Sequence, residues 1–403
     1  PGTPAGLGIA LNPIDCLPLT TTTPMAEPAI PLGGIGRREC DYYGFPLDLN
    51  ANLQMVRERC NTRERKQSIK WVKIEDSGER IPMRPKGKLK KLIRKGIPPH
   101  LRAKAWMELS GGAAKAEARP TNYYNSLLGV MDNASLMDEV SVASPDDPVA
   151  MQIELDLGRT FPSNHRVDSR LGRSSLQRVL MAYARHNPGI GYCQSMNYVA
   201  AMLLLVLESE EKAFWVMAAL LDDRLYPASY SENLSGCQVE IRTLGRLVDR
   251  KMPKLSAHLK ATGTEMTFLA TEWFLCLFSR TFPSETTARV WDAVMSEGPK
   301  VLHRVAIAML KQEQANLLAA SNTGDIIQAL QAAARQIVDR DALMKAAFRS
   351  VGSFPLRRIE KLRQEEQVVV DGEMRERAER RAANSAATAS KGISSMYSVS
   401  QGG

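Results

Sequence analysis

Residues 189–207 read GIGYCQSMNYVAAMLLLVL, and this stretch decides the fold that the sequence predicts. From Met196 to Leu207 apolar side chains fall on every side, which predicts a helix buried in the middle of a domain. Gly189 and Gly191 lie in the short turn before it and let another molecule approach the helix start closely. The longest uninterrupted apolar run, residues 198–207, is about half the length of a membrane-spanning helix. The stretch therefore indicates a helical core and no membrane span.

The segments around this helix also have helical patterns. Pro98 and Pro99 suit the first turn of a helix that residues 110–112 end. Ser174, with Gln177 three residues later, matches a capping box and predicts that a helix begins there. Further apolar periodicity predicts helices over residues 211–221, 238–250, 266–279, 284–295, 301–319, 325–338 and 341–349. No segment alternates like a strand and none recurs at a fixed interval, so the predicted fold class is all-α without a sheet.

Composition separates a folded body from two ends. Residues 1–36 are rich in Pro, Gly and Thr and lack periodicity, which predicts a flexible leader. Residues 357–381 are dense in both charge signs and predict a solvated helix, whereas the Ala, Ser and Gly that follow Ala382 predict a disordered tail. The folded body is expected between about Asp41 and Pro355.

The positive charge is concentrated in one segment. The chain has 53 Lys and Arg against 44 Asp and Glu, a net charge of +9. Residues 57–104 hold 17 basic and 5 acidic residues, a local net charge of +12, so the remainder of the chain sums to −3. Such a segment suits nucleic acid, anionic lipid or an acidic protein surface, or is an ordinary solvated helix face. Trp71 is the only large aromatic residue in this segment, with Trp106 two positions beyond it, so we expect no nucleic-acid partner.

The remaining composition excludes several classes of protein. With 44% hydrophobic and 24% charged residues the chain is neither disordered throughout nor a membrane protein. Its six Cys include no C-x-x-C pair and its five His no H-E-x-x-H, so we expect neither a metal site nor a disulfide framework. No secretory signal opens the sequence, and a reducing, cytoplasmic setting is the simplest inference.

Two segments place polar groups where a helical core does not need them. Ile153, Asp156 and Arg159 share a helix face by their spacing of three, close to the point where Gly158 indicates that the helix ends. Gln194 precedes the buried helix. Taken alone, an Asp–Arg pair is more often a structural ion pair, and a glutamine at a helix start is more often a capping or surface residue.

Together these segments resemble the paired signatures of the TBC domain, the helical module of Rab GTPase-activating proteins. Ile153, Asp156 and Arg159 match its I-x-x-D-x-x-R motif. Tyr192 and Gln194 match its Y-x-Q motif, which the family continues with residues such as Met196 and Asn197. Ser195 stands where many relatives have glycine.

The resemblance runs from about Leu92 to Ala320. Residues 95–98, Arg102 and Trp106 look like the segment that opens the domain in this family, and residues 41–45 look like a lead-in of some members. Arg102 and Trp106 lie one turn apart on an amphipathic helix, so we expect them to pack and cap the start of the domain.

The resemblance implies the organisation of the chain. We expect a multi-helix TBC domain of two helical subdomains over residues 92–350. A basic, partly helical N-terminal extension over residues 37–91 would precede it. The charged helix and tail of residues 351–403 would follow.

The resemblance also implies a mechanism with two catalytic residues supplied in trans. Arg159 would stabilise the charge that builds on the transferred phosphoryl group, and Gln194 would orient the attacking water in place of the GTPase's own glutamine. Asp156 would hold Arg159 in position and Tyr192 would shape the loop of Gln194. Ile153 and Asn197 complete the motifs as supporting residues.

The expected partner is a Rab-family small GTPase in its GTP form, which would carry GTP and Mg²⁺, so no cofactor of the chain's own is expected. The chain would not be a hydrolase by itself, and would regulate vesicle traffic as a GTPase activator. The alternative is a catalytically inactive TBC scaffold that binds Rab GTPases without accelerating hydrolysis. A family member that has lost this activity would typically lack the catalytic arginine or the catalytic glutamine, which are called the finger residues. Arg159 and Gln194 are both present, and this favours the activator. The basic segment would add peripheral contact with endomembranes.

Overall fold

The structure, a computed structural model, describes residues 39–47, 50–129 and 147–399. Within these residues the chain is helical and contains no strand, and the only β pairing is an isolated bridge between Cys40 and Pro46. The predicted all-α fold class is therefore confirmed. The predicted leader, residues 1–36, lies outside the described residues.

The helices follow one another with short connections. The first half contains α1 (Ala51–Asp76), α2 (Gly87–Lys95), α3 (Pro99–Ser110), α4 (Gly112–Glu117), α5 (Tyr123–Leu127), α6 (Pro148–Leu157), α7 (His165–Asp168), α8 (Arg170–His186), α9 (Met196–Leu207), α10 (Glu210–Ala218) and the π-helical turn η1 (Ala219–Arg224). The second half contains α11 (Ser235–Lys251), α12 (Pro253–Ala261), α13 (Met266–Leu275), α14 (Ser284–Glu297), α15 (Lys300–Gln312), α16 (Gln314–Ala319), α17 (Thr323–Arg335), α18 (Arg340–Lys345), the π-helical turn η2 (Ala346–Ser350) and α19 (Leu356–Val399).

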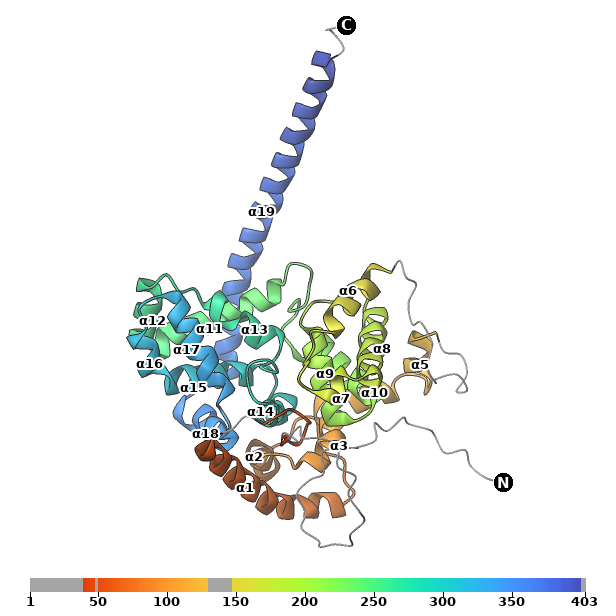
Figure 1. The fold of residues 1–403 in the computed structure, drawn as a ribbon, viewed down its shortest axis with the longest axis vertical. Helices are drawn as coiled ribbons and strands as arrows, with labels where there is room; N and C mark the ends of the chain where they lie inside the picture. Colours follow the sequence, from red (N-terminus) through yellow and green to blue (C-terminus); the bar gives the residue numbers. More distant parts are fainter. Residues whose placement is uncertain (1–38, 48–49, 130–146, 400–403) are drawn as a thin grey trace, which may run out of the picture.

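The helices form two groups, as the family resemblance implies. Figure 1 shows α5–α10 on one side and α11–α18 on the other, and α3 contacts α14 where the two groups meet. Every residue of α9 is buried, because its apolar side chains face neighbours on all sides. None of the helices in the described part of the chain has both the length and the apolar character needed to cross a bilayer.

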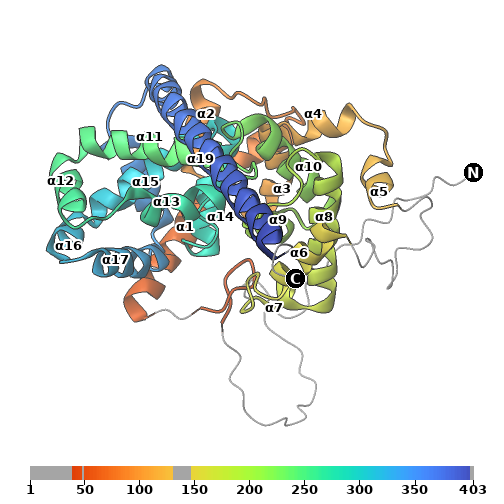
Figure 2. The same cartoon turned by 90° about the horizontal axis from the view of Figure 1, so that it is seen from above.

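The segments outside the family resemblance pack against the two groups. Trp71 of α1 is buried and donates from Nε1 to the carbonyl of Gly96 at 2.9 Å, which fixes α1 against the end of α2. Figure 2 shows α19 passing over α11, where Arg363 forms two hydrogen bonds with the carboxylate of Glu240. The helix then projects away from the body and continues to Val399, whereas the composition predicted a disordered tail after Ala382 (Figure 1). The alanines that follow Ala382 are strong helix formers, which favours this continuation.

Several helix boundaries differ from the prediction. The prediction that a helix begins at the capping box of Ser174 is wrong, because α8 begins at Arg170. The hydroxyl of Ser169 caps α8 by accepting from the backbone N–H of Gly172 at 3.0 Å. A Cβ on Gly172 would lie 2.0 Å from the carbonyl oxygen of Arg166, so only glycine permits the tight corner between α7 and α8. The helix predicted over 301–319 is divided between α15 and α16, and the one over 266–279 ends at Leu275.

A buried carboxylate joins the two groups of helices. Asp292 of α14 accepts from Arg102 Nε at 3.0 Å, from Trp106 Nε1 at 3.0 Å and from the backbone N–H of Ile97 at 3.0 Å. Arg102 also donates to the hydroxyl of Tyr43 at 2.6 Å. Because all of these groups are buried, their charges and donors are satisfied only by one another. Arg102 and Trp106 thus hold the start of α3 to the opposite group of helices.

Candidate functional site

Arg159 lies just beyond the carboxyl end of α6. The side chain of Asp147 caps the other end by accepting from the N–H of Val149 at 2.9 Å, and α6 ends at Leu157. Asp156 is 2% exposed, while 51% of the Arg159 side chain is accessible, and the two form an ion pair. The guanidinium therefore projects from the surface while a buried carboxylate limits its orientations.

Tyr192 forms a hydrogen bond with the other oxygen of the same carboxylate. Its hydroxyl donates to Asp156 Oδ2 at 2.5 Å, and its ring is buried. Burial, and then the neighbouring charge of Asp156, raise the pKa of Tyr192 far above its usual value, so the hydroxyl keeps its proton and remains a donor. Asp156 thus connects Arg159 with the loop that carries Gln194.

A second set of hydrogen bonds joins the two loops behind the ion pair. The Thr160 hydroxyl donates to the carbonyl of Asp156 at 2.6 Å, and the amide of Asn197 donates to Thr160 Oγ1 at 2.7 Å. The amide oxygen of Asn197 in turn accepts from the backbone N–H of Ser195 at 3.1 Å. Thr160 and Asn197 are both fully buried, so this connection is shielded from water.

Gln194 is exposed at the end of this network, directly before α9. The following residue, Ser195, has φ +100°, in the left-handed region that favours glycine. The chain before Gln194 is fixed at Asn187, whose amide donates to Asp222 Oδ1 at 3.0 Å. The loop is therefore held on both sides of the glutamine, while the glutamine side chain itself faces solvent.

Aromatic side chains pack against the loop that carries Arg159. Phe161 contacts Phe45 and Tyr198 edge to face, with centroid distances of 5.0 and 5.3 Å. The Tyr198 hydroxyl donates to the carbonyl of Arg159 at 3.0 Å. Asn164 donates to the carbonyl of Tyr43 at 3.0 Å, which holds the lead-in segment against this loop. Beside these rings lies a groove of about 620 Å³ with Arg159 in its wall.

All six predicted finger and supporting residues lie in this one region. Five of them stand in or directly beside the hydrogen-bonded network, while Ile153 is fully buried on the inner face of α6 and fixes that helix in the core. Sequence reasoning gave no role to Tyr198 or Asn164, and no local pattern marks either residue, because their partners become neighbours only in the folded chain.

The chemistry available here is that of a charged donor and a neutral amide. Arginine is permanently cationic and presents donors in a plane, and glutamine both donates and accepts. Burial, and then the charge of Asp156, raise the pKa of the Cys193 thiol beside Gln194 to about 11, so this thiol is protonated near neutral pH. In the described part of the chain no group of three His, Cys, Asp or Glu side chains is arranged to hold a metal ion.

Two exposed apolar side chains lie near these polar residues. Leu155, next to Asp156 on the outer face of α6, is 79% exposed. A second groove, of about 380 Å³, has Ser195 and the exposed ring of Phe268 in its lining. Exposed apolar side chains beside fixed polar groups are compatible with contact to another protein.

Comparisons with known proteins identify the family. The model of the Rab-GTPase-TBC domain family, RabGAP-TBC, matches residues 99–318. Growth hormone-regulated TBC protein 1 of Homo sapiens is 35% identical over 305 residues, which cover 74% of this chain and 85% of that protein. TBC1 domain family member 2A of Mus musculus is 33% identical over 84% of this chain, but the match covers only 37% of that longer protein.

Solved structures agree with this result. The crystal structure of the Chlamydomonas flagellar RabGAP TBC domain is 36% identical, with a TM-score of 0.68, and the match covers 77% of this chain and 99% of that one. The Ypt/Rab-GAP domain of Gyp1p shares the fold at 23% identity, with a TM-score of 0.55. On the family match over more than half of its residues, and on relatives more than 30% identical across most of it, the chain belongs to the Rab-GTPase-TBC domain family.

Proposed function

We propose that the chain is a GTPase-activating protein that stimulates GTP hydrolysis by a Rab-type small GTPase through Arg159 and Gln194. The observation that carries the proposal is the network that joins these two exposed side chains. Asp156 and Tyr192 form one connection between their loops, and Thr160 and Asn197 form the other. A purely structural Asp–Arg pair would not require two buried connections to an exposed glutamine.

Arg159 supplies the charge in this proposal. Negative charge spreads over the phosphoryl oxygens during transfer, and a guanidinium provided by a second protein stabilises it with donors that need no protonation change. Asp156 is buried and fixes one edge of the guanidinium, so the other edge is oriented before the partner binds. Such preorganisation lowers the reorganisation required during the reaction.

In this proposal Gln194 orients the water molecule that attacks the phosphoryl group. Its carbonyl oxygen accepts from the attacking water while its NH₂ donates, so one side chain fixes the water in line with the bond that breaks. The restraints at Asn187 and Ser195 hold its backbone in place. In this proposal the chain acts in trans and is not a hydrolase by itself.

The partner would be a Rab GTPase in its GTP form, which brings GTP and Mg²⁺ to the interface. The family supports a Rab partner, and the exposed leucine and phenylalanine beside the fingers suit a protein surface. We place the activator in the cytoplasm, where it would regulate vesicle traffic and contact endomembranes peripherally. Lys86 and Lys88 support the membrane contact because both are exposed and belong to the basic segment.

A single-turnover screen against a panel of Rab GTPases tests the activity. We expect the chain to accelerate hydrolysis by at least one Rab by roughly 10³-fold or more over its intrinsic rate. Binding of a GTP-loaded Rab without acceleration would replace this proposal with the inactive scaffold. If the chain neither bound nor stimulated any Rab in the panel, both assignments would fail.

A further inference from the structure

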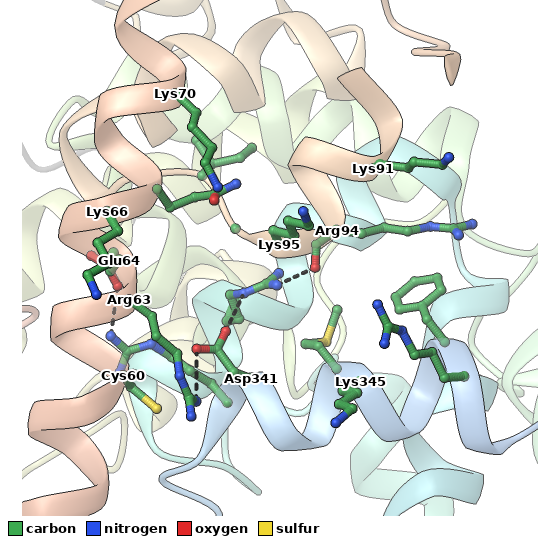
Figure 3. A pocket seen from close by; sticks show the side chains of 18 residues that line it. Cys60, Arg63, Glu64, Lys66, Lys70, Lys91, Arg94, Lys95, Asp341 and Lys345 are labelled. Carbon is green, nitrogen blue, oxygen red and sulfur yellow. Dashed lines mark hydrogen bonds and ion pairs between the residues drawn. The ribbon is translucent and has the colours of Figure 1, made fainter. Parts of the chain in front are cut away.

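A large cationic pocket lies away from the two finger residues. It has a volume of about 850 Å³ and is formed by α1, the end of α2, and α18 with η2 (Figure 3). Its lining contains ten Lys and Arg but only two acidic residues, Glu64 and Asp341. Arg159 and Gln194 are absent from the lining, so the pocket is separate from the proposed GTPase-facing site.

The two acidic residues leave most of this positive charge unpaired. Glu64 accepts from Arg340 at 2.7 Å, and Asp341 lies 3.5 Å from Arg63. Six other lining cations form no ion pair within the described residues: Lys66, Lys70, Lys91, Lys95, Lys345 and Arg349. The lysines among them come from α1, α2 and α18 and line the same pocket (Figure 3). All six are exposed at the rim, so water screens their mutual repulsion, while their combined positive potential attracts an anion into the pocket.

Arg289 of α14 provides the strongest indication of a ligand. It is only 3% exposed, yet its Nε and Nη1 have no hydrogen-bond partner among the described residues. Nη2 donates to the carbonyl of Arg94, and the nearest carboxylate oxygen, on Asp341, lies 3.9 Å from Nε. Buried guanidinium donors without partners are rare and unfavourable.

The backbone around Arg289 is shaped to leave this guanidinium room. Gly96 has φ +116°, and a Cβ there would lie 3.0 Å from Arg289 Nε. Gly96 therefore serves both the turn after α2 and the close approach of the arginine. The result is a cavity with a buried arginine at its base and exposed lysines and an arginine around its rim.

The size and chemistry of the pocket indicate the class of ligand. Its volume is in the range of sites for small molecules. Phe348 is the single aromatic residue in the lining, and the guanidinium of Arg94 covers its ring at 4.3 Å, so no exposed platform is available for a nucleic-acid base. Several lysines and arginines around a concave site suit closely spaced phosphate groups, which carry more charge per volume than carboxylates.

We propose that this pocket binds a compact polyphosphorylated anion, either the headgroup of a phosphoinositide lipid or a soluble polyphosphate. The ligand would accept from Arg289 at the base and from lysines of α1, α2 and α18 at the rim. A lipid headgroup in this position would bring α1 and α2 against a membrane. The site goes beyond the proposed GTPase activation and does not depend on it.

Titration calorimetry of the full chain with inorganic tripolyphosphate, near physiological ionic strength, tests whether the pocket binds a soluble polyphosphate. We expect the paired variants Lys66→Ala/Lys70→Ala and Lys345→Ala/Arg349→Ala each to lower affinity roughly tenfold or more, because each removes two charge-assisted contacts. The matched control is Arg65→Ala/Lys73→Ala, which removes two exposed cations of the same helix α1 outside the pocket. Its affinity should change by less than about twofold.

Flotation with phosphatidylcholine vesicles tests the lipid arm. Vesicles carrying phosphatidylinositol bisphosphate are compared with vesicles carrying phosphatidylserine at equal total charge. A preference for the phosphoinositide that the pocket variants lose assigns a lipid headgroup, and tripolyphosphate binding without that preference assigns a soluble ligand. The proposal is overturned if the parent chain binds neither probe, or if the control variant loses as much affinity as the pocket variants. Failure here would leave Rab stimulation by Arg159 and Gln194 unaffected.

Discussion

Ser195 occupies a backbone conformation that suits glycine better than serine. Its φ of +100° brings Cβ close to the backbone, which is unfavourable by about 1 kcal/mol for a residue other than glycine. The conformation directs the chain from the Gln194 loop into α9, so it belongs to the geometry of the site. This offers a physical reason for the glycine that many relatives have at the position.

Replacing this serine should therefore stabilise the protein. We expect Ser195→Gly to raise the free energy of unfolding by about 0.5–1 kcal/mol, measured by chemical denaturation, and to keep the stimulation of GTP hydrolysis. Ser195→Ala is the control, because it removes the hydroxyl but keeps Cβ, and should not be stabilised. A glycine variant less stable than the parent would show that the serine hydroxyl contributes more than the strain.

Asp156 is a positioning residue, since its contacts are with Arg159 and Tyr192. We expect Asp156→Asn to lower the single-turnover rate roughly 100-fold through misplacement of the guanidinium, with little change in Rab affinity. Tyr192→Phe removes one donor to the carboxylate and should have a smaller effect, roughly tenfold. Equal rates for Asp156→Asn and the parent would remove the positioning role, provided thermal unfolding shows both folded.

At the scale of elements, the lead-in segment at residues 39–47 has a pH-dependent anchor. Asp41 accepts from the backbone N–H of Tyr43 and of Phe45, both at 2.9 Å, and from the hydroxyl of Ser284. Burial is the largest cause that raises the pKa of Asp41 to about 6. The native state therefore holds this proton more tightly than the unfolded state, whose Asp pKa is near 3.9.

The sign of the pH effect follows from this shift. Relative to Asp41→Asn, the parent should lose stability as the pH rises from about 4 to about 6, by an amount on the order of 3 kcal/mol. Denaturation of both proteins across this range gives the difference, in which the other titrating groups cancel. A parent that instead gained stability relative to the variant over this range would contradict the raised pKa.

The lysines of the basic segment differ in their roles. Lys90 lies 3.2 Å from the carboxylate of Glu297, which is only 2% exposed and also accepts from Arg94. Lys86 and Lys88 are exposed and form no ion pair within the described chain. Lys90 is therefore part of the contact between α2 and α14, while the other two are available to an anionic surface.

Charge reversal should separate these roles. Lys86→Glu/Lys88→Glu should weaken binding to anionic vesicles at least about tenfold, with unchanged unfolding and unchanged stimulation of a Rab in solution. Lys90→Glu should lower the free energy of unfolding by roughly 2 kcal/mol, because it places a like charge beside a buried carboxylate. Vesicle binding that stayed unchanged in the double variant would assign Lys86 and Lys88 to an ordinary solvated surface.

At the scale of the whole molecule, the sequence predicts what is local and misses what is distant. The buried helix α9, the end of α6 before Arg159 and the all-α class follow from apolar spacing and from glycine over a few residues. The ion pair between Arg102 and Asp292 cannot be predicted in this way, because 190 positions separate the two residues. The partners of Tyr198 and Asn164 are hidden for the same reason. The local sequence does not distinguish Ser169 from Ser174 as the helix cap, because the choice depends on the corner at Gly172.

The cationic pocket also could not be predicted from the local sequence. Composition located an excess of positive charge in residues 57–104, but α18 and η2 supply the opposite wall from more than 200 positions away. Only the fold brings Lys66, Lys95 and Lys345 around one cavity and buries Arg289 at its base. A net charge therefore becomes a defined site only at the level of the tertiary structure.

Single-turnover GTP hydrolysis by a Rab that responds to the chain, measured with Arg159→Ala and Gln194→Ala, decides whether these two side chains act as trans catalytic groups. Arg173→Ala is the matched control, because Arg173 is also a half-exposed arginine paired with an aspartate. We predict that each finger variant loses roughly 10³-fold or more of the stimulation while remaining folded and bound to the Rab, and that the control keeps it. If both finger variants stimulated hydrolysis as strongly as the parent chain, the dual-finger account would be contradicted.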